Sequence, residues 1–102
     1  MVRAGFKKSN GFLTGFDISG HAGYADSGQD IVCAAVSSAV QLTLNLLAEF
    51  GFGPEVNIGD NIIKCSVAPA DGASRIIDQL EKHLGSVLEE FPKTIKITIS
   101  EV

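Results

Sequence analysis

Alternating apolar and polar residues at the start of the chain predict a β-hairpin. Two strand-like segments, residues 3–8 and 12–19, flank Asn10 and Gly11, a pair typical of type I′ turns between antiparallel strands. A period of two in the second segment predicts one face made of Phe12, Thr14, Phe16 and Ile18.

In residues 31–50, the hydrophobic residues no longer alternate and instead follow a pattern typical of a helix. This segment contains neither Gly nor Pro, and its apolar residues cover most faces of a helix. We therefore predict a central, largely buried helix. Asp30 is the expected N-cap, and Gly51 stands where a glycine often ends a helix.

The second half of the chain repeats the order strand, strand, helix. Residues 54–58 and 62–68 predict a hairpin around a turn at 59–61. Asp71 is expected to cap a helix that runs to about residue 91, with apolar residues on one side and charged residues on the other. Pro92 ends this helix, and residues 94–99 predict a last strand with three inward side chains, Ile95, Ile97 and Ile99.

The predicted order is therefore ββαββαβ, within one domain that spans residues 1–102. The simplest layered arrangement is a two-layer α+β fold, with a mixed sheet of about five strands and both helices packed on one face.

Composition and charge limit the classes of partner. The chain has 102 residues, 45% of them hydrophobic, and a net charge of −4, which lacks the positive field that binding to nucleic acid uses. A secretory leader pattern and an uninterrupted apolar run of about 20 residues are both missing from the sequence. We expect a cytoplasmic protein without a membrane partner, whose acidic surface suits a basic protein.

One cysteine and one histidine border a glycine-rich loop. With Asp30 as N-cap, Cys33 is expected in the first helical turn, where free N–H groups and the helix dipole stabilise a thiolate. The loop is long enough to bring His21 to Cys33 as a general base. This pair is suited to acyl transfer, with the Cys33 N–H as the first candidate oxyanion donor.

Neighbouring residues have two interpretations each. Asp30 caps the helix or orients the imidazole, and Ser37, one turn beyond Cys33, supports the site or bonds a backbone carbonyl. Gly20, Gly23 and Gly28 give the loop conformational freedom that a bound peptide could use.

The remaining candidates have structural interpretations. Cys65 shares a strand face with Ile63 and Val67 and is expected in the core, and His83 is expected in solvent on the second helix. No metal-binding or nucleotide-binding motif is present in the sequence. Two rival functions stay open: a non-catalytic peptide-binding or assembly module, and a redox-sensing thiol.

The stretch around Cys33 resembles the ribosomal-processing cysteine proteases. The resemblance rests on the pattern G-H-A-x-x-A-x-x-G-x-D-I-V-C-A-A-V-S, which begins at Gly20 and ends at Ser37, and on the strand order. It implies Cys33 as nucleophile and His21 as base, supported by Gly20, Asp30 and Ser37, without a cofactor. It also implies a substrate loop made of Gly23, Tyr24, Ala25, Asp26, Ser27 and Gly28. Members of this family are homodimers that remove the N-terminal extension of a large-subunit ribosomal protein, the twenty-seventh.

Overall fold

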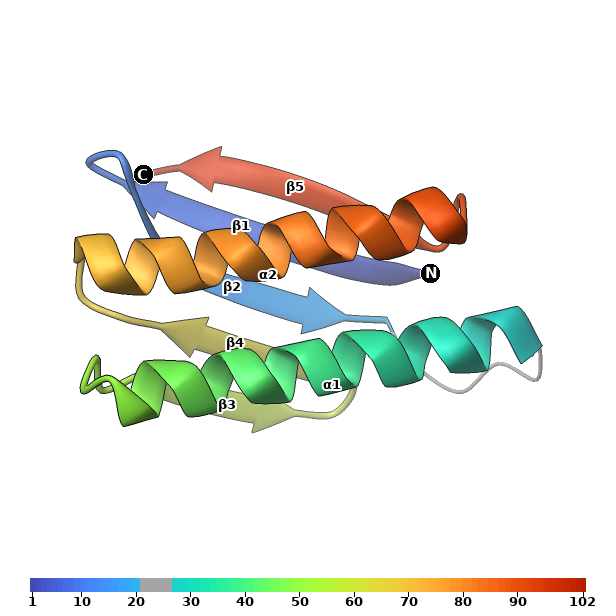
Figure 1. Cartoon of the computed structure of the whole chain (residues 1–102), viewed down its shortest axis with the longest axis horizontal. Helices are drawn as coiled ribbons and strands as arrows, with labels where there is room; N and C mark the ends of the chain where they lie inside the picture. Colours follow the sequence, from blue (N-terminus) through green and yellow to red (C-terminus); the bar gives the residue numbers. More distant parts are fainter. Residues whose placement is uncertain (21–26) are drawn as a thin grey trace.

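The predicted element order is confirmed in the computed structural model, which describes residues 1–20 and 27–102 (Figure 1). The elements are β1 (Val2–Ser9), β2 (Phe12–Ser19), α1 (Ser27–Glu49), β3 (Glu55–Gly59), β4 (Ile62–Ser66), α2 (Asp71–Glu90) and β5 (Ile95–Glu101). The five strands form one sheet in the order β3-β4-β2-β1-β5. Only the β1–β5 pair is parallel among the strand pairs of the described residues, so the sheet is mixed, as expected.

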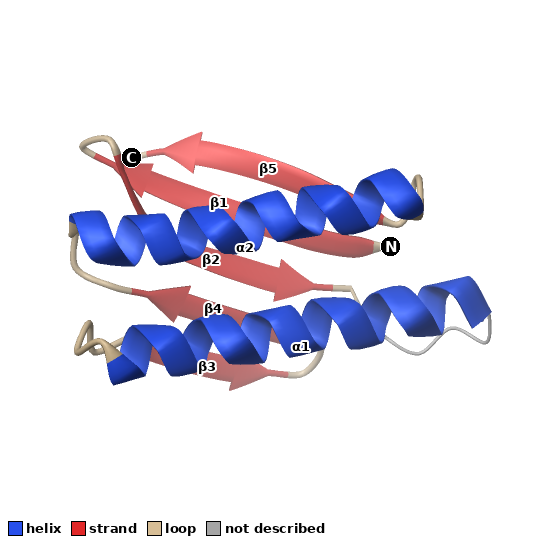
Figure 2. Ribbon diagram, viewed as in Figure 1, coloured by secondary structure: helices blue, strands red, loops and turns tan. Residues whose placement is uncertain are grey.

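Both helices lie on one face of the sheet, α2 over β1 and β2 and α1 over β4 and β3 (Figure 2). The core lies between the two layers and is built on inward side chains of the middle strands, among them Phe6, Phe16 and Ile18, each at most 2% exposed. The other face carries the alternate residues, including Arg3, Asp17 and Lys64, as in antiparallel sheets with one solvated face. The two-layer α+β prediction is therefore confirmed.

The first hairpin contains a β-bulge that the alternation in the sequence did not predict. Asn10 and Gly11 both have positive φ, 53° and 83°, as the predicted type I′ turn requires. The pairing then shifts between Lys7, opposite Gly15, and Lys8, opposite Leu13. The shift leaves Thr14 without a partner on β1 and reverses the alternation beyond it.

The bulge changes which residues of β2 reach the core. Leu13 is buried, whereas Phe12 and Thr14, which the sequence placed on one face with Phe16 and Ile18, are only partly buried. The amide of Leu13, beside the bulge, donates a hydrogen bond to Oγ of Ser74 on α2, 2.9 Å away. This bond ties the sheet to the second helix.

Helix α1 begins four residues earlier than predicted and is less buried. It starts at Ser27, so Asp30 lies inside the helix and is not its N-cap. Serine is a favoured residue at a helix start, and an acidic residue in the first turn complements the helix dipole. The predicted end is confirmed, since Gly51 has φ 80° and its amide bonds the carbonyl of Ala48 at 3.1 Å.

One side of α1 faces solvent although it is apolar. Val32, Val36, Val40 and Leu47 are buried against the sheet, whereas Ile31 and Leu42 are 56% and 59% exposed. Residues Ile31–Glu49 are long and apolar enough, with a mean hydropathy of 1.8, to match a membrane span by length and composition, and 28% of this stretch is buried inside the protein. The prediction of a largely buried helix is wrong, because α1 covers the edge of the sheet and has α2 on one flank only.

Two details of the C-terminal half also differ from the prediction. The N-cap of α2 is Ala70, without a side-chain hydrogen bond, and Asp71 is the first helical residue, paired with Arg75 at 3.0 Å. Ile95 is buried, but Ile99 is 49% exposed. Ile99 lies near the end of an edge strand, where only one neighbouring strand is available to cover it.

Candidate functional site

Cys33 lies in the second turn of α1, because the helix begins at Ser27 and Cys33 is its seventh residue. The free N–H groups of a helix belong to its first four residues, and the dipole acts mainly over the first turn. An amide at the position of Cys33 bonds the carbonyl four residues before it. The structure therefore does not support the expectation that the helix terminus activates this thiol, or that the Cys33 N–H is a free oxyanion donor.

The side of α1 that carries Cys33 faces away from α2. Residues three, four and seven positions later share this side, namely Val36, Ser37 and Val40. These three residues line a groove between α1 and the β3–β4 hairpin. Cys33 itself is partly exposed and packs against the edge of the core. The thiol thus lies about one helical turn from the groove.

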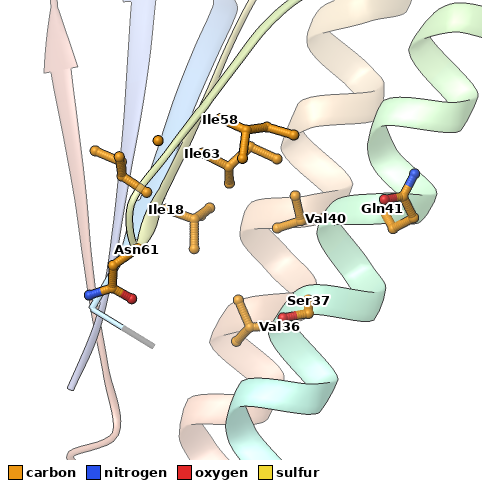
Figure 3. Close-up of a pocket in the computed structure, with 10 residues that line it drawn as sticks. Ile18, Val36, Ser37, Val40, Gln41, Ile58, Asn61 and Ile63 are labelled. Atoms are coloured by element: carbon orange, nitrogen blue, oxygen red, sulfur yellow. The ribbon is translucent and has the colours of Figure 1, made fainter. Parts of the chain in front are cut away.

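The groove has an apolar floor and a polar rim (Figure 3). Its volume is about 220 Å³. Ile18 and Ile63 project from the sheet toward Val36 and Val40 of α1. The full lining is Ile18, Val36, Ser37, Val40, Gln41, Ile58, Gly59, Asn61, Ile62 and Ile63. None of these residues carries a charge.

Gly20 connects the end of β2 to the same region. Its φ is 82°, and its amide donates a hydrogen bond to the carbonyl oxygen of Asn61 at 3.4 Å, in the turn between β3 and β4. His21 follows Gly20 directly in the sequence and lies outside the described residues. Gly20 thus lies beside Asn61 of the groove, whose α1 residues begin at Val36, three residues after Cys33.

Part of the predicted substrate loop is helical. Ser27 and Gly28 are the first two residues of α1 and do not belong to a loop. Gly23, Tyr24, Ala25 and Asp26 lie outside the described residues, with His21.

Cys65 has the structural role that the sequence predicted. It lies on β4 opposite Phe16 and is 4% exposed. Burial raises the pKa of the Cys65 thiol from 9.0 to about 11, because an anion is poorly solvated there. This thiol is therefore both covered and neutral at physiological pH.

The groove is the part of the site that sequence reasoning missed. Ile58, Asn61 and Ile63 come from the second hairpin, about 30 residues after Cys33 in the chain. A signal was available in Ile58, an apolar residue at the end of a short strand, but only the sheet order shows that this strand is an edge. His83 is exposed on α2, as predicted. The residues of ranges 1–20 and 27–102 contain no group of three or more potential metal ligands.

A two-layer α+β fold with a partly exposed cysteine is compatible with a small cysteine protease. The sequence profile described as cysteine protease Prp matches residues 1–96, so the chain belongs to that family. A curated relative, the ribosomal processing cysteine protease Prp of Bacillus subtilis (strain 168), is 38% identical over 64 residues. The match covers 60% of this chain and 56% of that relative.

Solved structures share the fold at lower sequence identity. The essential ribosomal processing protease Prp from S. aureus, in complex with a substrate peptide, matches 98% of this chain and 100% of its own, with a TM-score of 0.88 and 22% identity. SMU.848 from Streptococcus mutans matches 100% of this chain and 96% of its own, with a TM-score of 0.84 and 22% identity. The S. aureus protease is also known with a covalently linked product peptide.

Proposed function

We propose that this protein is a cysteine endopeptidase in which Cys33 is the nucleophile. The observation that supports the assignment is the contrast between its two cysteines. Cys65 is buried, and its raised pKa keeps it neutral, whereas Cys33 is partly exposed beside an apolar groove. A thiol nucleophile must be accessible and able to ionise, so Cys33 is the cysteine that fits the family's chemistry.

His21 is proposed as the general base. It takes the Cys33 proton, and Sγ attacks the scissile carbonyl carbon to give a tetrahedral oxyanion. Collapse of this intermediate breaks the C–N bond, and the imidazolium returns the proton to the leaving amine. Water, deprotonated by the same imidazole, then hydrolyses the thioester and restores the thiol. Since Cys33 lies beyond the first turn of α1, we assign thiolate stabilisation mainly to His21.

The proposed substrate is the N-terminal extension of the twenty-seventh large-subunit ribosomal protein. The ribosomal processing function named for the Bacillus subtilis and S. aureus relatives supports a ribosomal substrate, and the net charge of −4 suits a basic one. The covalent product peptide of the S. aureus protease supports a thioester route. A cytoplasmic location is proposed with this substrate.

We also propose that the protein acts as a homodimer. The outer side of α1 is uncharged and exposed at Ile31, Ala34, Ser38, Leu42 and Asn45, a surface that suits contact with a second copy. Placing a charge there with Leu42→Glu should yield a monomer in sedimentation analysis, while Glu49→Gln, at the end of the same helix, should not. An unchanged assembly of Leu42→Glu would place the interface elsewhere.

Peptide cleavage by variants of the two cysteines tests the nucleophile. The substrate is a peptide that spans the ribosomal extension and the first mature residues, and products are read by mass spectrometry. Cys33→Ala should lose turnover by a factor of roughly 10⁴ or more, as expected when a nucleophile is removed, and Cys65→Ala should keep most of it. Tight binding without cleavage by the wild-type protein would instead support the peptide-binding module, and fast reaction with peroxide without cleavage would support a redox sensor.

A further inference from the structure

We propose that the groove between α1 and the β3–β4 hairpin binds one large apolar side chain of the substrate, two or three residues from the scissile bond. The inference rests on the proposed function, with Cys33 as the nucleophile. It assigns a specificity-determining role to Ile58, the wall of the groove that β3 provides.

The distance from the thiol sets the position of this side chain. Val36 and Val40 lie three and seven residues after Cys33, which is about 5 to 10 Å along the helix axis. A peptide in extended conformation advances about 3.3 Å per residue. When its scissile carbonyl is at Cys33, the side chain that reaches the groove therefore belongs to a residue about two or three positions away.

The lining of the groove sets the chemistry of this side chain. Its floor is made of Val and Ile side chains from both layers, without a charged residue, so an ionised side chain would lose solvation there without a partner. A dry cavity of about 150 Å³ is known to bind benzene. The groove, at about 220 Å³, therefore has room for a branched aliphatic or aromatic side chain.

Ile58 is exposed to solvent in the free protein, and a bound side chain would cover it. It is 78% exposed, although it lies on the helix-facing side of β3 opposite Ile63. Removing it should leave stability nearly unchanged, because it contributes little to the core of the free protein. Val56 is a matched control, since it lies on the same face of the same strand, is 39% exposed and does not line the groove.

The test combines a peptide series with these two variants. Each residue of the ribosomal extension peptide is replaced in turn by Ala, and kcat/KM is measured. For the wild-type protein, we expect a loss of roughly tenfold or more at one apolar position two or three residues from the cut bond. In Ile58→Ala, the same change in the peptide should lower kcat/KM by a few-fold at most. In Val56→Ala, it should lower kcat/KM as much as in the wild-type protein. Equal losses in both variants, or a sensitive position that carries a charged residue, would overturn the proposal.

A binding experiment separates failure of the groove from failure of the proposed enzyme. Affinity of the same peptides is measured for Cys33→Ala, with and without Ile58→Ala. Binding that depends on Ile58, without turnover by the wild-type protein, would refute the endopeptidase and retain the groove. Turnover whose peptide preference does not depend on Ile58 would retain the endopeptidase and refute the groove. Absence of both binding and turnover would refute both proposals.

Discussion

The amide of Gly20 donates a hydrogen bond to the carbonyl oxygen of Asn61 and so joins the end of β2 to the turn between β3 and β4. Gly20 is the residue before His21, and Asn61 lies on the rim of the groove. The contact therefore fixes the point from which the histidine segment starts relative to the groove. Its geometry requires a glycine, because φ is 82° and an added Cβ would collide with the main-chain oxygen of Met1.

Gly20→Ala should lower peptide cleavage more than its effect on stability would suggest. A positive φ alone costs about 1–2 kcal/mol for alanine, and the collision with Met1 adds to this by displacing the chain before His21. Gly11→Ala is the control, since Gly11 also has a positive φ, 83°, and nothing lies within 4 Å of its added Cβ. We expect similar unfolding free energies for the two variants to within a few kcal/mol, and a large loss of kcat/KM in Gly20→Ala alone. Equal activities would argue against a role of this anchor.

An alkylating reagent should modify Cys33 long before Cys65 in the native protein. Cys33 is partly exposed, whereas Cys65 is 4% exposed and burial raises the pKa of its thiol to about 11, so little thiolate is present at neutral pH. Iodoacetamide treatment followed by peptide mapping should give a ratio of rates of about 100 or more. In denaturant the two sites should react at similar rates. Comparable labelling in the native state would remove the main argument for assigning Cys33 as the nucleophile.

Replacing His21 should slow alkylation of Cys33 at neutral pH. Cys33 lies in the second turn of α1, where the helix terminus offers little stabilisation, so the proposed mechanism relies on the His21 imidazole to take the proton of the thiol. His21→Ala should reduce the rate roughly tenfold. His83→Ala is the control, since His83 is exposed on α2. A rate that is unaffected by His21→Ala would show that the thiol is not activated by this residue in the free protein.

Local patterns predicted the order of elements well, because each strand and helix has a strong periodicity and clear turn residues. Asn10 and Gly11 adopt the positive φ values that a type I′ turn needs, and Gly51 ends α1 as expected. The bulge at Thr14 could not be predicted, because it depends on the pairing with Lys7 and Lys8 on another strand. One unpaired residue is enough to bring Leu13, which the alternation placed on the face opposite Phe16 and Ile18, into the core.

The chemistry of the site was also easier to predict than its geometry. Cys33 and Ser37 share a side of α1 by helical spacing alone, which sequence reasoning used. The start of α1 was misplaced because both Ser27 and Asp30 are residue types that favour helix N-termini, and the apolar pattern becomes visible only at Ile31. The groove could not be found in this way, since Ile58 reaches α1 only through the order of strands in the sheet.

The buried thiol of Cys65 should make the folded protein less stable at alkaline pH. Its pKa is about 11 in the folded state and 9.0 for an exposed cysteine, so between these values the unfolded chain releases a proton that the folded chain retains. The contribution is fully present below about pH 9 and is lost as the pH rises toward 11, up to about 2–3 kcal/mol. Other groups titrate in the same range, but they are common to the wild-type protein and its variants.

Denaturant unfolding at several pH values between 7 and 11 measures this loss by comparison with Cys65→Ala. The alanine variant should be less stable at neutral pH, because it loses packing in the core, but its stability should fall less steeply above pH 9. Cys33→Ala should show the same fall as the wild-type protein between pH 9 and 11, since it retains the buried Cys65 thiol. Parallel curves for Cys65→Ala and the wild-type protein would show that Cys65 ionises as readily in the folded state as in the unfolded chain, and would reopen the choice between the two cysteines.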